Sequence, residues 1–405
     1  MIASWKERGE RAPLLAPALH SHASMEEKSP KLARFIAARL TALVLSTFVL
    51  GGTGHCAALE LSFDYEAAQQ LMAALDDQTL ESEEARRLST LPGIQAMIEK
   101  AHEFDPAGTP EAFVRDVVSV AHGAGLFADP FQLMHVREHS SEVRSVLAAL
   151  VADPETTVQH VAARVTPFQP AGCSLAVRVL LTAGGTSDGW SLPAAQKGPQ
   201  RFAVALDQFR GDLSGLQLLM AHELFHNVQS CARPYDYTEH ADEGPKARVM
   251  GLLQSLEDEG TASLVGDAMA WPDGGAYVDW FRGKFRRNLD RLPSIVTLFT
   301  SLLYRANYDP QAKFDDLYGV AFTGGWDSNA YFLGYHMAQV IDGRLGRPRL
   351  IALLSQSPAQ FVTTYMSVAK SDEPRFSADT LALIRAADAA TSKHAHRTSV
   401  PVTAD

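Results

Sequence analysis

The chain has 405 residues, 46% of them hydrophobic, which is enough for one large domain or two modest ones. Its formal net charge is −11, and no basic stripe is interleaved with aromatic residues. We therefore expect no nucleic-acid partner, and we interpret the acidic balance mainly as favouring solubility.

The N-terminus predicts export. Arg34 and Arg39 precede an eleven-residue apolar run, 40–50, and small residues follow as far as Ala58. A positive segment, a short apolar run and a small-residue exit are typical of a secretory signal peptide, and eleven residues are too few to span a bilayer. We expect residues 1–58 to be removed, leaving a periplasmic or secreted protein without a stable membrane span.

Two further features of this region refine that expectation. Residues 1–24 lie upstream of the signal pattern, so Met25 is a candidate true start. The first 58 residues hold seven Lys/Arg and four Asp/Glu, so the remaining chain has a formal net charge of −14.

Helical periodicity dominates the next hundred residues. Apolar residues recur at a spacing of three to four in 65–75, 112–120 and 143–150, and Ser82 begins another helix. We expect 59–165 to be a helical N-terminal region.

A small sheet is predicted next. Residues 174–182 and 202–206 are rich in β-branched and other apolar residues, and the glycine-rich loop 184–189 lies between them. Cys173 and Cys231 flank this part of the chain. Export makes a disulfide between them possible, and two separate buried thiols are the alternative.

The residues His222-Glu223-Leu224-Phe225-His226 match the pattern H-E-x-x-H. Residues four apart lie on one face of a helix, so both imidazoles can bind one ion. Glu223 lies beside the first ligand and can reach water at that ion. The motif therefore holds two metal ligands and a base.

The flanks of the motif predict a helix over 216–233, a stretch without Pro or Gly. Asp212 or Ser214 can cap its start, and Pro234 ends it. A strand, a short turn and then such a helix is the order found in zinc peptidases. By that order, the strand 202–206 is the candidate for holding a substrate backbone.

A third ligand is expected from the acidic triplet 257–259, which lies in a predicted helix over 246–270. A structural zinc site is disfavoured, because such sites take four protein ligands and the chain has no Cys-x-x-Cys. Adjacent helical side chains point about 100° apart, so one acid faces the metal. The small residues 260–262 allow this helix to approach the first, which favours Glu259, with Glu257 as the alternative.

The remaining pattern is helical, and the whole predicts a mostly helical α+β protein whose small sheet lies beside the metal helix. We expect a zincin-like core over 166–270, a helical C-terminal region over 271–390 that completes the cleft, and a flexible tail over 391–405. The expected C-terminal helices are 277–305, 328–344, 348–355 and 376–390.

The motif followed by Glu259-Gly260-x-Ala262 resembles the gluzincin class of zinc peptidases. The later run Tyr331-x-x-Gly334-Tyr335 is similar to a helix in a family of proposed zinc-dependent peptidases that is classed as a domain of unknown function. Together the resemblance covers roughly residues 166–366. In many gluzincins an Asp four residues after the ligand Glu orients a zinc-bound His, and here that residue is Ser263.

The resemblance implies one Zn²⁺ ion, a peptide or protein substrate, and hydrolysis by activated water with a glutamate as general base. It also implies a hydroxyl or imidazole donor for the oxyanion, although Tyr331 and Tyr335 could equally be a packing pair. The residues implied are His222, His226 and Glu259 as ligands, Glu223 as base, and Tyr331, Tyr335 or His336 as donor.

Two other classes of function fit these residues. One is a helical binding or scaffold protein that keeps an inactive zinc helix, and the other is a zinc hydrolase acting on a non-peptide bond. The intact Glu223 argues against the first, because a retired site has no need of its base. The sequence does not separate a peptidase from the second, since substrate choice depends on the shape of the cleft.

Overall fold

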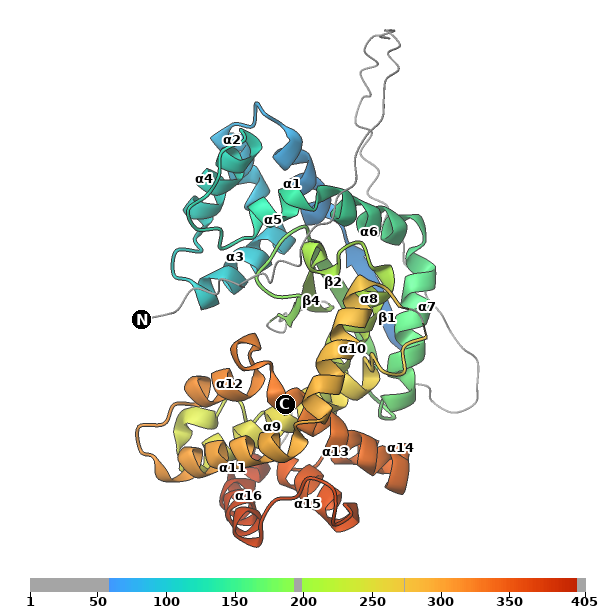
Figure 1. The fold of residues 1–405 in the computed structure, drawn as a ribbon, viewed down its shortest axis with the longest axis vertical. Coiled ribbons are helices and arrows are strands. Elements are labelled where there is room, and N and C mark those ends of the chain that lie inside the picture. The colour runs from blue at the N-terminus through green and yellow to red at the C-terminus, as the bar shows by residue number, and fades with distance from the viewer. Residues whose placement is uncertain (1–57, 193–198, 273, 399–405) are drawn as a thin grey trace, which may run out of the picture. The chain divides into compact units, whose positions relative to one another are not determined.

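The computed structural model describes residues 58–192, 199–272 and 274–398. The predicted signal peptide therefore lies outside the described residues, except for Ala58. The described residues form 16 α-helices and one four-stranded mixed sheet (Figure 1), which confirms the mostly helical α+β class.

The sheet has the strand order β1-β2-β4-β3. The first three strands are parallel, and β3 pairs antiparallel with β4. Its strands are β1 (Leu59–Asp64), β2 (Leu175–Thr182), β3 (Gly189–Ser191) and β4 (Gln200–Ala205). Most of β2 is buried on both faces, as expected of a central parallel strand.

Two expectations about the sheet were wrong. The region 59–165 is not purely helical, because β1 comes from it and pairs with β2. The strand 202–206 does not offer a free edge, because β4 lies between β2 and β3. The edge strand is β3, whose three residues are too few to show an alternating pattern in the sequence.

Seven helices precede the second strand. Of these, α1, α3 and α7 contact the sheet directly, and α4 packs on α1 and α2. The helices are α1 (Glu66–Asp76), α2 (Ser82–Leu88), α3 (Pro92–Phe104), α4 (Pro110–Ala121), α5 (Leu133–Glu138), α6 (Ser140–Ala152) and α7 (Pro154–Val165).

The metal motif lies on α8 (Leu213–Ala232), which packs against the sheet and against α9 (Pro245–Val265). The Asp212 side chain caps α8 by accepting the Gly215 amide at 3.0 Å, as the sequence predicted. Pro234 disfavours helical geometry at the preceding residue, which accounts for the end of α8. Both helices are buried on most sides, so each is held by its packing partners.

The C-terminal helices surround α9, which contacts α11, α12, α13, α15 and α16 (Figure 1). Their bounds are α10 (Ala276–Leu289), α11 (Leu292–Tyr308), α12 (Phe314–Phe322), α13 (Asn329–Leu345), α14 (Arg347–Leu353), α15 (Pro358–Val368) and α16 (Ala378–Thr398).

Three predictions about this part need correction. The expected helix 277–305 is divided into α10 and α11, and Pro293 in the first turn of α11 marks the new start. The tail expected from residue 391 is helical as far as Thr398, because α16 continues. The helices α12 and α15 were not predicted as separate elements.

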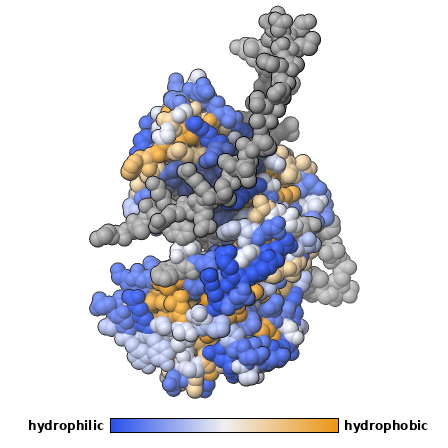
Figure 2. Space-filling model, in the orientation of Figure 1, coloured by the Kyte–Doolittle hydropathy of each residue, from blue (hydrophilic) through white to orange (hydrophobic). Residues whose placement is uncertain are grey.

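A disulfide joins Cys173, just before β2, to Cys231 in the last turn of α8, with the two Cα atoms 5.9 Å apart. None of the helices in the described part of the chain combines the length and the apolar character that crossing a bilayer requires. The visible surface is mostly hydrophilic, with small apolar patches (Figure 2), in keeping with the acidic composition.

Candidate metal centre

Three side chains from two helices converge on one point. His222 and His226 come from α8, and Glu259 comes from α9. The Oε2 atom of Glu259 lies 3.2 Å from Nε2 of His222 and 3.5 Å from Nε2 of His226. The two Nε2 atoms are 3.2 Å apart. One face of α8 therefore presents both imidazoles to a carboxylate on its neighbour, as the spacing of the motif requires.

A neighbouring glutamine fixes the state of His226. The amide nitrogen of Gln229 donates to the Asp258 carbonyl at 2.7 Å and to the Thr261 hydroxyl at 2.8 Å. Its amide oxygen therefore faces Nδ1 of His226, 2.7 Å away. Because that oxygen only accepts, Nδ1 carries a proton, and Nε2 is the ring nitrogen left to bind a cation at the cluster. A contact of this kind orients a histidine for metal binding.

The charges at the cluster favour a cation. Burial alone would raise the pKa of Glu259, yet the two imidazoles hold it well below its usual range. Burial lowers the pKa of His226, but the charges of Glu259 and Glu223 outweigh it and raise that pKa to about 10. Oε2 of Glu259 is buried without a hydrogen bond of good geometry among the described residues.

Convergent lone pairs on two nitrogens and one carboxylate oxygen are the donor set of a catalytic zinc site. The residues therefore fit one Zn²⁺ ion, and three protein ligands leave a position open for water.

Glu223 lies between the metal cluster and the edge strand. A Cβ placed on Gly189, the first residue of β3, would come 2.9 Å from Cγ of Glu223, so only glycine allows this approach. Burial raises the pKa of Glu223, and the two motif histidines oppose that shift. A buried carboxylate with a raised pKa beside a metal site has the properties of a general base.

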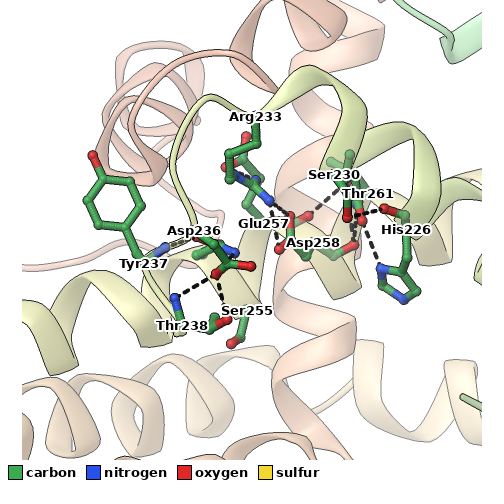
Figure 3. Close-up of polar contacts among 12 residues, drawn as sticks. His226, Ser230, Arg233, Asp236, Tyr237, Thr238, Ser255, Glu257, Asp258 and Thr261 are labelled. Atoms are coloured by element: carbon green, nitrogen blue, oxygen red, sulfur yellow. Dashed lines mark hydrogen bonds and ion pairs between the residues drawn. The ribbon is translucent and has the colours of Figure 1, made fainter. Parts of the chain in front are cut away.

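The other two acids of the triplet face elsewhere. Arg233, just beyond α8, donates to Glu257 at 3.2 Å and to Asp258 at 2.9 Å. Figure 3 shows the guanidinium directed at both carboxylates. Burial raises the pKa of Glu257 to about 8, with Arg233 opposing the shift. The structure thus places Glu259 at the imidazoles and Glu257 in a separate ion pair.

Two glycines bring α13 onto α9. A Cβ on Gly260 would lie 2.2 Å from the backbone carbonyl carbon of Gly334, so the helices touch backbone to backbone. The small residues after Glu259 were expected to face α8. Gly260 faces α13 instead, and Thr261 makes the contact with α8 through Gln229. The glycine of the Tyr331-x-x-Gly334 run therefore serves this crossing.

Tyr331 lies one turn before the crossing and reaches the cluster. Its ring stacks on His222, with centroids 6.0 Å apart. Burial and the charge of Glu259 raise the pKa of Tyr331 well above its ordinary value. Of the three sequence-predicted donors, this is the one that the structure brings to the cluster.

Tyr335 and His336 are not brought to the cluster. The Tyr335 hydroxyl donates to Asp267 and accepts from Gln339, each at 3.1 Å, inside the protein. The His336 ring packs against Tyr365, with centroids 5.9 Å apart. Tyr335 directly follows Gly334 and lies one turn beyond Tyr331, and residue 336 is rotated about 140° from residue 331 around α13.

Sequence reasoning missed three features of the site. Tyr318 on α12 is half-buried, and burial and then the charges of Glu259 and Glu223 raise its pKa. Its hydroxyl makes no hydrogen bond to another described residue. The second missed feature is Gln229, which the sequence could have indicated because it lies one turn after His226 on the same helix. The sequence could not have indicated Tyr318, because its position depends on how α12 packs.

The third missed feature is a polar pair behind Glu223. The Tyr277 hydroxyl donates to Asp188 at 2.6 Å, and the charge of Asp188 raises the pKa of Glu223. Asp188 directly precedes Gly189, so the pair lies where β3 begins. As for Ser263, it makes no hydrogen bond to either imidazole in the part of the chain that the structure describes.

One comparison with known proteins gives a match, to a protein family. The model of the family described as "Putative zinc dependent peptidase (DUF5700)" matches residues 85–373. The chain therefore belongs to that family, and the match includes every residue of the cluster. No curated protein and no solved structure matches the chain.

Proposed function

We propose that the chain is an exported metallopeptidase that hydrolyses peptide bonds at the cluster, with one zinc ion held by His222, His226 and Glu259. The observation that carries this proposal is the convergence of three lone-pair atoms beside a buried glutamate. Zinc bound there would supply a Lewis acid and make water acidic enough to ionise near pH 7. Membership of a family described as zinc-dependent peptidases supports the same assignment.

Glu223 is the proposed general base. It takes a proton from the attacking water, whose oxygen adds to the carbonyl carbon of the scissile bond. It then delivers that proton to the leaving nitrogen as the carbon–nitrogen bond breaks. Its burial next to Gly189 limits its motion and keeps the carboxylate beside the cluster.

Tyr331 and Tyr318 are the proposed donors to the oxyanion that forms during this addition. Tyr331 lies against His222 and Glu259, and the hydroxyl of Tyr318 is free of other described partners. Tyr335 is not part of this proposal, because its hydroxyl is committed to Asp267.

The proposed substrate is an extended peptide paired with the outer edge of β3, which pairs with no further strand among the described residues. This edge strand begins at Gly189, which touches Glu223, so a peptide paired there would run past the base. Main-chain hydrogen bonds to an edge strand hold a peptide without regard to most of its side chains.

Export is proposed on two grounds. The segment 34–58 has the pattern of a signal peptide, and the Cys173–Cys231 disulfide is stable in an oxidising compartment. The periplasm or the extracellular space is such a compartment.

The test combines metal analysis with cleavage of a peptide library. We expect wild type to bind one zinc and to cleave peptides. Glu223→Gln should keep the zinc and lose activity by about 10³- to 10⁴-fold. His222→Ala should lose the zinc, and Glu239→Gln, at an exposed glutamate, should change neither. Full activity of purified Glu223→Gln would exclude the proposed base, and well-folded wild type without metal or cleavage would favour a scaffold.

A further inference from the structure

One half-buried cation, the ammonium group of Lys284, has no role in the chemistry described above. Lys284 lies in α10 and makes no ion pair with any described residue. Its one hydrogen bond goes to the Ser328 hydroxyl at 3.4 Å. An ammonium group has three donors, so two of them are unused within the described residues.

The surroundings of Lys284 are aromatic. Its ammonium nitrogen is 5.8 Å from the centroid of the Trp280 ring and 5.9 Å from that of Phe332. Both distances are within the range of cation–π attraction. Trp280 is 49% exposed, so one wall of this site faces solvent. Burial lowers the pKa of Lys284, which reflects the cost of keeping the charge there.

The carboxylates nearest to Lys284 are committed to other partners. Asp188 accepts the Tyr277 hydroxyl at 2.6 Å. Asp327 accepts from Asn288 at 2.9 Å and pairs with Arg287 at 3.7 Å. Their charges favour the ammonium form of Lys284, but neither carboxylate forms an ion pair with it. Lys284 therefore has carboxylates nearby, but none of them forms an ion pair with its ammonium group.

Lys284 lies between two segments that border the cluster. Tyr277, Trp280 and Lys284 follow one another on one face of α10, and Tyr277 reaches Asp188 beside the start of β3. At the other end, Phe332 is the neighbour of Tyr331, which stacks on His222. The ammonium is thus placed between the edge strand and the helix that carries the stacked tyrosine.

The backbone beside Lys284 is strained. Asp327 and Ser328 are consecutive residues with positive φ, 65° and 50°, just before α13. Neither is a glycine, and such conformations cost free energy that the surrounding structure must supply. This geometry brings the Ser328 hydroxyl to the ammonium, where it forms a second polar group facing the same space.

We propose that Lys284, with Ser328, is a carboxylate-binding subsite that selects peptides carrying a negative group close to the scissile bond. The inference rests on the proposed peptidase function and names its substrate class. The carboxylate can come from an acidic side chain or from the C-terminus of the peptide. Either would take the unused ammonium donors and the Ser328 hydroxyl.

The test measures binding, so that it does not depend on turnover. The zinc-loaded full chain carrying Glu223→Gln is titrated with short peptides blocked at both ends, in pools that differ only by Glu or Gln at one position. A third pool keeps Gln and has a free C-terminus. We expect the pool with the matching carboxylate to bind about ten- to a hundredfold more tightly than the blocked Gln pool. The pool that gains affinity identifies the source of the carboxylate.

Three further variants locate the effect. Lys284→Met keeps the apolar stem and should abolish the preference, whereas Lys284→Arg should retain it. Lys370→Met, at an exposed lysine, is the control and should change nothing. Equal binding of all pools to the Glu223→Gln chain, or a preference that survives in Lys284→Met, overturns the subsite. Absence of cleavage by wild type would overturn the peptidase proposal while leaving this binding result to decide the subsite.

Discussion

Two neighbouring parts of α9 place buried acids against α8 in different ways. Glu257 and Asp258 face Arg233, which supplies a fixed positive charge and hydrogen bonds to both. Glu259 faces His222 and His226, and Gln229 holds the ring of His226 so that Nε2 points toward it. The acids at Arg233 are therefore neutralised by a side chain of the protein. At Glu259, two imidazoles and one carboxylate converge with no arginine or lysine among them.

The difference shows why burial of an acid does not by itself indicate a functional site. Arg233 keeps 6% of its side chain exposed and Glu257 none, so their ion pair completes a structural contact between two helices. The cluster at Glu259 is slightly more exposed and has no arginine or lysine, so a positive charge must come from a proton or a metal ion. This contrast predicts which substitutions affect metal binding and which affect only stability.

The largest expected difference is in zinc affinity, between a variant with Gln in place of Glu259 and one with Gln in place of Glu257. Glu259→Gln replaces the one negatively charged ligand of three, so zinc affinity should fall at least about a hundredfold. Glu257→Gln should leave zinc affinity unchanged, because its side chain bonds Arg233. Competition with a chelator of known affinity measures both. Equal zinc affinity of the two variants would mean that the ligand lies elsewhere.

Removing the guanidinium of Arg233 should lower the stability of the protein without affecting metal binding at Glu259. Arg233→Met leaves two buried carboxylates without their partner and should lower the free energy of unfolding by about 3–5 kcal/mol. Urea unfolding of the metal-free chain measures it. Arg87→Met is the matched control, since Arg87 pairs with Glu83 on an exposed helix and should cost less than about 1 kcal/mol. A change in zinc stoichiometry in Arg233→Met would show that the two clusters are not independent.

The sequence predicted the parts of the site that lie within single helices. The spacing of His222 and His226 alone places both imidazoles on one face, and the absence of Pro and Gly predicts the helix beneath them. The fold class followed from the long helical periodicity and two apolar strands. These features are local, so no knowledge of packing was needed.

Features that depend on packing between elements were not predictable. The edge strand β3 has three residues and shows no pattern of its own. Tyr318 is close enough for the charges of Glu259 and Glu223 to raise its pKa only because α12 packs against α9 and α13. The choice between Tyr331, Tyr335 and His336 depends on where α13 crosses α9, and that crossing is defined by Gly260 meeting Gly334.

The smallest expected effect sharpens the contrast between the clusters, because Gln229 contacts both. Its amide holds the Asp258 carbonyl, and its oxygen accepts from His226. Gln229→Leu removes that acceptor, so zinc affinity should fall by about ten- to a hundredfold. Gln229→Glu keeps an acceptor for Nδ1–H and should bind zinc more tightly than the leucine variant. Gln217→Leu, at a buried glutamine elsewhere on α8, should leave the affinity unchanged. If Gln229→Leu bound zinc as tightly as wild type, orientation of His226 would have to come from helix packing alone, and the two clusters would differ in charge only.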